Sequence, residues 1–248
     1  MIPETQDPTA TVTFIRLEDG RTYAVTAWHV IEIFRHAAIA DGADPESYFL
    51  PVAPGIMIGP PFIQPPKPWT APRPDICLRP IDPDLPAHIG KAFFEFRTSP
   101  TPSFPVLYAL AVGYPTLSKS PHLDQLGERL AMQCVHAIAK GVGSAQESDQ
   151  VQFLSSIEEQ PPAESLSGLS GGPVFWSDPN SYGLLGFIKE AMDVKPKPDE
   201  DTLYDGPRVH FMCQRADYQM FLEWAAYADE AFPREREALN RAIKEKGT

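Results

Sequence analysis

Cysteine is scarce in this chain, and the cysteines present are not arranged as a disulfide framework. Only three occur in 248 residues, Cys77, Cys134 and Cys213, and an odd number cannot all pair within one chain. Neither they nor the six histidines show the Cys-x-x-Cys or His-x-x-x-His spacing of a metal site. We therefore expect a reduced, cytoplasmic protein without a bound metal.

Long apolar runs and positive charge are also in short supply. No stretch approaches the roughly 18 apolar residues that span a bilayer, and the polar, acidic residues 1–8 do not read as a secretory leader. Lys and Arg number 21 against 33 Asp and Glu, a formal charge of -12. This excess repels phosphate backbones and anionic lipids, so we expect neither nucleic acid nor membrane as a partner. It would attract a basic peptide, although solubility alone also accounts for it.

Helical periodicity is nearly absent before the C-terminus, where strand-like runs dominate. Residues 9–30 alternate on either side of Asp19-Gly20, a dipeptide typical of hairpins. Further runs lie at 91–96, 106–112, 131–138, 150–155, 172–176, 182–188 and 209–213. The proline-rich stretch 51–74 argues against central strands or long helices there. These patterns predict an all-β fold, an antiparallel barrel or sandwich.

Two helical segments are predicted beside these strands. A short helical turn is expected over residues 30–35, directly after His29. From residue 217 to about 246, aromatic residues and alanines recur at near-helical spacing, which predicts a C-terminal amphipathic helix with a possible break at Pro233.

Three segments carry residues suited to nucleophilic catalysis, in the order His, Asp, Ser. A serine hydroxyl needs a base to take its proton, a group to orient that base and donors for the oxyanion. The segments are Thr26-Ala27-Trp28-His29-Val30, Pro74-Asp75-Ile76-Cys77-Leu78 and Gly168-Leu169-Ser170-Gly171-Gly172-Pro173. Each has a plain structural interpretation: a strand-end histidine, a strand start and a tight turn. Their joint occurrence in this order is what favours chemistry.

In these segments the chain resembles the trypsin-like (chymotrypsin-fold) serine peptidases, over roughly residues 9–224. The resemblance implies that His29 is the general base, Asp75 its orienting partner and Ser170 the nucleophile, with the N–H groups of Gly168 and Ser170 as the oxyanion hole. It also implies a double antiparallel β-barrel, with six strands in each barrel at residues 9–98 and 103–215. A helical tail at 216–248 would lie across the second barrel. No cofactor is implied, and the composition favours a bacterial intracellular type.

The resemblance also implies a specificity pocket. Its floor would be Glu164, six positions before the nucleophile, followed by Ser165, and its wall would include Lys189, Glu190 and Ala191. A carboxylate at the floor would pair with an arginine or lysine at P1, the substrate residue before the cleaved bond. The expected partner is therefore a protein or peptide substrate that is basic at P1. An alternative interpretation stays open: if Lys189 or Arg208 forms an ion pair with Glu164 within the protein, the pocket has no free carboxylate and no basic preference.

Leu169 departs from the secreted zymogens of the family, which carry an acid just before the serine to pair with a freed N-terminus. Activation by N-terminal trimming is therefore not expected, and control by a regulatory protein partner is one alternative. Two other functions stay open. The Gly-x-Ser-x-Gly spacing around Ser170 also fits an α/β-hydrolase esterase, with His210 as its histidine. A peptidase fold can also serve as a latent or non-catalytic peptide-binding module.

Overall fold

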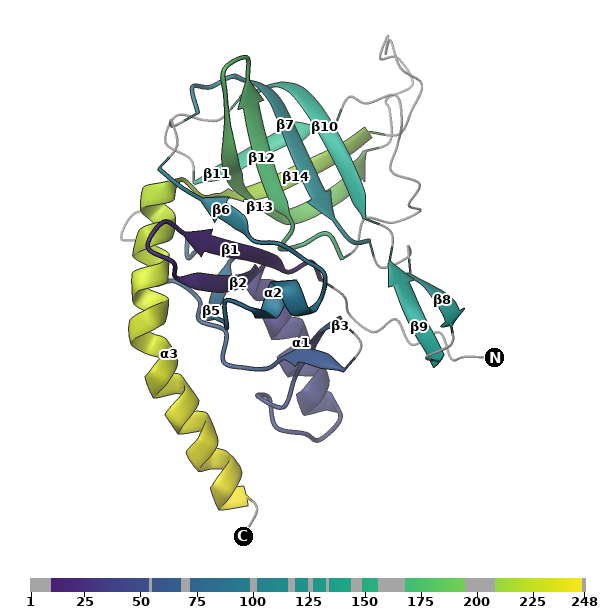
Figure 1. Ribbon diagram of the computed structural model, residues 1–248, viewed down its shortest axis with the longest axis vertical. Helices are drawn as coiled ribbons and strands as arrows, with labels where there is room; N and C mark the ends of the chain where they lie inside the picture. The colour runs from purple at the N-terminus through teal and green to yellow at the C-terminus, as the bar shows by residue number, and fades with distance from the viewer. Residues whose placement is uncertain are drawn as a thin grey trace.

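The computed structural model describes residues 10–53, 55–67, 72–98, 102–115, 119–124, 127–132, 134–143, 149–155, 168–194 and 208–246. Strands dominate the chain and a long helix ends it (Figure 1), which confirms the predicted β-rich class with a C-terminal helix. Among the described residues, no helix has both the length and the apolar character needed to cross a bilayer.

The elements follow one another with short connections over most of the chain. The helices are α1 (Trp28–Ala40), α2 (Leu85–His88) and α3 (Tyr218–Lys246). The strands are β1 (Thr13–Leu17), β2 (Thr22–Thr26), β3 (Leu50–Ala53), β4 (Ile56–Ile58), β5 (Cys77–Pro80), β6 (Phe94–Phe96), β7 (Val106–Gly113), β8 (Lys119–Asp124), β9 (Gly127–Met132), β10 (Val135–Val142), β11 (Gln150–Leu154), β12 (Pro173–Asp178), β13 (Ser181–Val194) and β14 (Arg208–Arg215).

The N-terminal half is built on a four-stranded sheet in the order β5-β2-β1-β6. Strands β1 and β2 form the predicted hairpin, and Gly20 in its turn has a φ of 86°, a left-handed conformation that glycine adopts without strain. Strand β6 joins β1 in parallel. Six antiparallel strands were expected in this half, whereas the described residues place four in the sheet.

The proline-rich stretch explains the smaller sheet. Its strands β3 and β4 pair with each other as a separate hairpin, and a single bridge between Ile63 and Leu78 links the stretch to β5. Because proline has no N–H to donate to a ladder, such a segment is poorly suited to the middle of a sheet. The expectation that residues 51–74 hold no central strand agrees with this arrangement.

The C-terminal half is a curled, six-stranded antiparallel sheet in the order β10-β7-β12-β13-β14-β11 (Figure 1). Its concave side encloses a core that includes Val106, Val151 and Trp176. Strand β13 pairs with β12 over residues 181–187 and with β14 over residues 186–194, and the register with β14 shifts between Ile188 and Glu190. This bulge places the Lys189 carbonyl beside Ser170.

Helix α3 packs against the N-terminal sheet, so the expectation that the tail lies across the second barrel is wrong. Phe221 and Trp224 share a buried cluster with Tyr23 of β2, and the Asp229 carboxylate accepts hydrogen bonds from Tyr23 Oη and Arg21 Nη1, each at 2.8 Å. A sheet must bury its apolar face against another element, and α3 covers the apolar face of this small sheet. Pro233 lies within the helix and does not end it.

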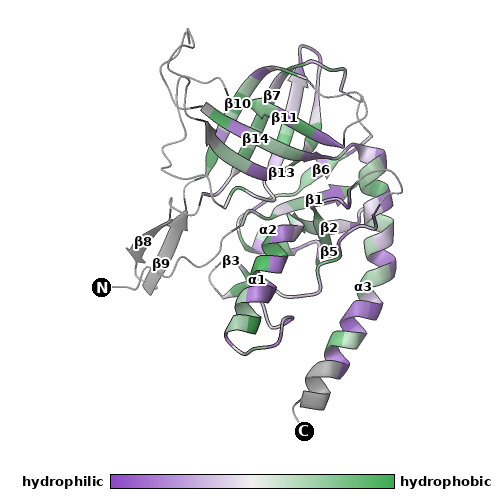
Figure 2. Cartoon of the chain, turned by 180° about the vertical axis from the view of Figure 1, so that it is seen from behind, coloured by the Kyte–Doolittle hydropathy of each residue, from purple (hydrophilic) through white to green (hydrophobic). Residues whose placement is uncertain are grey.

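The hydropathy of α3 follows this packing. Figure 2 shows hydrophobic residues along the part of α3 beside β2 and β5, and mainly hydrophilic residues on the coloured part that extends beyond these strands. Phe187 of β13 belongs to the same buried cluster as Phe221, and the two ring centroids are 6.3 Å apart. The helix therefore also covers the junction between the two halves of the chain.

Phe221→Ala is expected to lower the free energy of unfolding by about 3–5 kcal/mol, because it removes a fully buried ring from this junction. Urea unfolding measures the change. The control is Tyr182→Ala, whose side chain is 75% exposed and whose loss should cost no more than about 0.5 kcal/mol. Equal stability of the two variants would contradict a central role for α3 in the fold.

Candidate active site

His29 lies in the first turn of α1, immediately after β2. The first N–H groups of a helix have no partner within it, and Ala27, the residue before the helix, provides no side-chain cap. The Asp75 carboxylate supplies one from a distant part of the chain, since its Oδ1 accepts from the His29 backbone N–H at 2.9 Å. The start of the helix and the position of Asp75 are therefore fixed together.

The second oxygen of the same carboxylate holds the His29 ring. Asp75 Oδ2 lies 2.8 Å from His29 Nδ1. Because an ionised carboxylate only accepts hydrogen bonds, this contact places a proton on Nδ1 and leaves Nε2 of the neutral ring as an acceptor. The His29 side chain is 37% exposed and that of Asp75 is 15% exposed, so a substrate can reach the imidazole while the carboxylate is shielded.

The segment that carries Asp75 is tied down by side chains that bond to its backbone. Gln64, a buried residue, donates from Nε2 to the Pro74 carbonyl at 2.9 Å. Arg73 donates from Nε to the Pro65 carbonyl at 2.8 Å and from Nη2 to that of Gln64 at 3.1 Å. These bonds join residues 64–65, in the middle of the proline-rich stretch, to residues 73–74 at its end, and they fix the backbone directly before Asp75.

Ser170 completes a continuous line of polar contacts. Its Oγ lies 3.2 Å from His29 Nε2, across 141 residues of sequence. The same oxygen lies 3.1 Å from the Lys189 carbonyl oxygen, to which the hydroxyl can also donate. The structure thus brings His29, Asp75 and Ser170 together in the order that sequence analysis predicts. It also adds a second acceptor for the single hydroxyl proton.

The turn around Ser170 has a distinctive backbone. Gly168 and Gly171 have φ values of 97° and 87°, which favour glycine. The carbonyls of Gly168, Ser170 and Gly171 all accept hydrogen bonds from residues 11–13. Among the described residues, the N–H groups of Gly168 and Ser170 donate to no acceptor. The turn that carries the two predicted oxyanion donors is thus held through its carbonyls.

Charge keeps Asp75 ionised. Burial acts to raise its pKa, but the hydrogen bonds and charge of His29, with a smaller contribution from the charge of Lys189, outweigh that effect and hold the pKa of Asp75 below its usual range. An ionised carboxylate can both fix the imidazole and stabilise an imidazolium formed beside it.

The predicted specificity residues are only partly placed. Glu164 and Ser165 lie outside the described residues. Lys189 lies at the bulge of β13, with its carbonyl at Ser170 and its charge near enough to affect Asp75. The Glu190 side chain is exposed, whereas Ala191 packs against the core of the C-terminal sheet.

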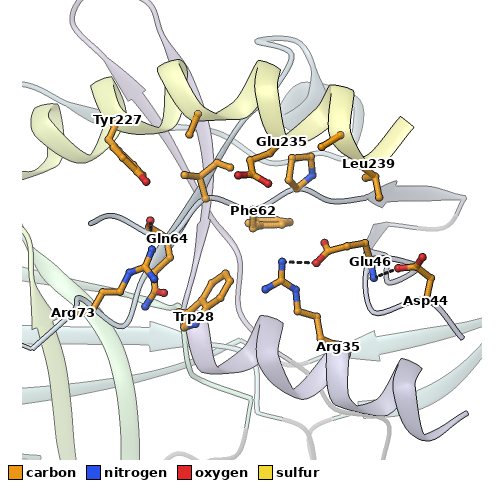
Figure 3. Close-up of a pocket in the computed structure, with 14 residues that line it drawn as sticks. Trp28, Arg35, Asp44, Glu46, Phe62, Gln64, Arg73, Tyr227, Glu235 and Leu239 are labelled. Carbon is orange, nitrogen blue, oxygen red and sulfur yellow. Dashed lines mark hydrogen bonds and ion pairs between the residues drawn. The ribbon is translucent and has the colours of Figure 1, made fainter. Parts of the chain in front are cut away.

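A cavity of about 510 Å³ opens beside the segments that lead to His29 and Asp75, between α1, residues 61–64 and α3 (Figure 3). Trp28 and Arg73 line it, but none of the three aligned polar residues does. Figure 3 shows Glu235 of α3 directed into the cavity opposite the Arg35–Glu46 ion pair. The cavity is thus separate from the space in front of Ser170.

Sequence reasoning did not identify Thr11, Gln64 or Arg73 as part of the site. No motif marks them, because each acts through hydrogen bonds to backbone carbonyls, which are 157 residues away for Thr11 and at most ten residues away for Gln64 and Arg73. In the part of the chain that the structure describes, no group of three His, Cys, Asp or Glu side chains is placed to hold a metal ion. A comparison with models of known protein families finds no match, and no curated protein matches the chain.

The lowered pKa of Asp75 predicts a pH-dependent contribution to stability. A carboxylate whose pKa is lower in the folded than in the unfolded state stabilises the fold at pH values above its unfolded-state pKa, which is about 3.9 for aspartate. That contribution is lost as the pH falls through the folded-state value. Relative to Asp75→Asn, the wild type should therefore be more stable at pH 5, and the difference should shrink below about pH 4. Urea unfolding across this range measures it. A difference that is unchanged down to pH 3 would contradict the ionised Asp75–His29 contact.

Proposed function

We propose that this protein is a trypsin-like serine endopeptidase in which Asp75, His29 and Ser170 form the catalytic triad. The observation that carries the proposal is the unbroken line of contacts from the Asp75 carboxylate through both ring nitrogens of His29 to Ser170 Oγ. Each residue has the chemistry its position requires. The β-rich fold with a curled six-stranded sheet supports the same family.

The geometry supports an acyl-enzyme mechanism. Ser170 Oγ attacks the carbonyl carbon of a peptide bond, and its proton passes to His29 Nε2 while Asp75 stabilises the imidazolium. The oxyanion of the tetrahedral intermediate is bound by the N–H groups of Gly168 and Ser170. His29 then gives its proton to the leaving amine as the C–N bond breaks. Water attacks the resulting ester by the same route and releases the acid and Ser170.

One contact favours a second candidate, a latent or peptide-binding form of the same fold. The Ser170 hydroxyl has one proton and two nearby acceptors, His29 Nε2 and the Lys189 carbonyl. When the proton points to Lys189, the oxygen is not activated by His29. A protein held in that state would bind a peptide without cleaving it until a regulatory partner shifted the hydroxyl.

Ser170→Ala is expected to abolish peptide cleavage and fluorophosphonate labelling without loss of folding, because the variant lacks only the attacking oxygen. Mass spectrometry of the labelled protein locates the modified residue. Ser177→Ala on β12 is the control and should be labelled as the wild type is. Peptidase activity retained by Ser170→Ala would refute the assignment, and a folded wild type that resists labelling would favour the latent or binding form.

We further propose limited, regulatory cleavage after arginine or lysine, by an enzyme located in the cytoplasm. Support for the basic preference comes from the sequence position of Glu164, six residues before Ser170, and from the net charge of -12. A substrate guanidinium would provide both the charge and the donors that such a carboxylate requires.

This preference predicts faster cleavage of short peptides with Arg or Lys before the cleaved bond than of those with Leu or Phe, by about tenfold or more. The ratio of kcat/KM values measures it. Glu164→Gln should reduce the ratio, whereas Glu223→Gln, an exposed acid on α3, should not. Equal cleavage of all four peptides would contradict a basic specificity while leaving the triad assignment intact.

A further inference from the structure

The turn that carries Ser170 is held by residues 11–13, which lead into β1. Thr11 Oγ1 donates to the Gly168 carbonyl at 2.9 Å, and the Thr11 N–H donates to the Ser170 carbonyl at 3.0 Å. Two residues further on, Thr13 Oγ1 donates to the Gly171 carbonyl at 2.9 Å. Three of the four carbonyls from residue 168 to residue 171 are thus fixed by this one segment, and both threonine side chains are buried.

Thr11 also contacts the strand that leads into His29. Its carbonyl accepts from Thr26 Oγ1 at 3.0 Å, and Thr26 is fully buried at the end of β2. Its hydroxyl oxygen accepts from the Tyr114 N–H at 3.0 Å, just after β7. A single residue therefore connects the base of the His29 segment, the Ser170 turn and the C-terminal sheet.

Close packing leaves little room for these groups to shift. A Cβ atom built on Gly171 would lie 2.3 Å from the Thr11 carbonyl oxygen, and one on Gly113 would lie 3.0 Å from Thr11 Oγ1. Both glycines are therefore needed for the approach of Thr11 to the turn. Interdigitation of this kind transmits a displacement at Thr11 directly to the backbone around Ser170.

Leu169 gives this contact particular importance. It is buried and apolar, so it cannot form the ion pair with a freed N-terminus that the acid at this position forms in the secreted zymogens of the trypsin-like family. Among the described residues, the polar contacts that reach the turn from the N-terminal half are those of residues 11–13, together with the His29 contact to Ser170 itself.

We propose that Thr11 is a positioning residue that sets the orientation of the Ser170 turn, and with it the Gly168 and Ser170 N–H groups, relative to His29. The proposal rests on the peptidase function proposed above. Thr11 touches no reacting atom. It acts by holding the Gly168 and Ser170 carbonyls, whose peptide planes fix where the neighbouring groups of the turn lie. In this chain residues 11–13 thus keep the site assembled without a cleavage step.

Thr11→Val is expected to lower the second-order rate of Ser170 labelling by a fluorophosphonate by about ten- to 100-fold. In this reaction Ser170 Oγ displaces fluoride from phosphorus, its proton passes to His29, and the phosphoryl oxygen occupies the oxyanion site. Valine matches threonine in shape but cannot bond to Gly168. Thr11→Ser retains the hydroxyl and should restore most of the rate.

Thr22→Val is the matched control. Thr22 is also a buried threonine of the N-terminal half, in β2, and its Oγ1 donates to the Ile81 carbonyl at 2.7 Å, away from Ser170. It should lose thermal stability to a similar extent as Thr11→Val but keep the wild-type labelling rate. An equal decrease of the labelling rate in both variants would mean that Thr11 contributes only to general stability, and it would overturn the proposal.

Hydrogen exchange tests the same contact independently of activity. The amides of Gly171 and Gly172 donate to Ile188 and Leu169 within the folded turn. Their exchange should be about tenfold faster in Thr11→Val and unchanged in Thr22→Val. If the fluorophosphonate does not label the wild-type protein, that result counts against the peptidase proposal. The hydrogen-exchange rates of the Gly171 and Gly172 amides would then still decide whether Thr11 holds the turn. Unchanged exchange at these two amides overturns it in either case.

Discussion

The double hydrogen bond between the Asp75 carboxylate and His29 is the constraint on which the site depends. One oxygen caps the first turn of α1 and the other fixes the imidazole. The same acid therefore places the histidine backbone and orients its ring, so neither can be repositioned alone. Because Gln64 and Arg73 tie down the backbone before Asp75, the proline-rich stretch becomes part of the support of the site.

The local elements follow closely from the sequence. Asp19-Gly20 marks a real hairpin, the alternating runs become strands, and the C-terminal periodicity becomes α3. The three motif segments meet as predicted, because each pairs a chemically distinctive residue with a recognisable strand end or glycine turn. Patterns with a period of two or near four residues are local properties, and local properties are what a single sequence exposes.

Long-range contacts account for what could not be predicted. Helix α3 was expected on the second half of the chain, yet its Phe221 packs against Tyr23 and Phe96 of the first. An amphipathic helix shows that it needs an apolar surface without showing which one. The role of Thr11 could not be predicted either. A threonine in an alternating sequence pattern is the same residue whether its hydroxyl contacts solvent or a carbonyl 157 residues away. The parallel pairing of β6 with β1 likewise leaves no local signal.

The position of α3 has a consequence for how the protein is made. The sheet that supplies His29 is synthesised early, but its apolar face is covered by residues near the end of the chain. A nascent chain that has not yet released α3 leaves Ile15 and Tyr23 without that cover. The first sheet can therefore bury this face only after α3 has been made, so the part of the chain that is synthesised first is among the last to complete its packing.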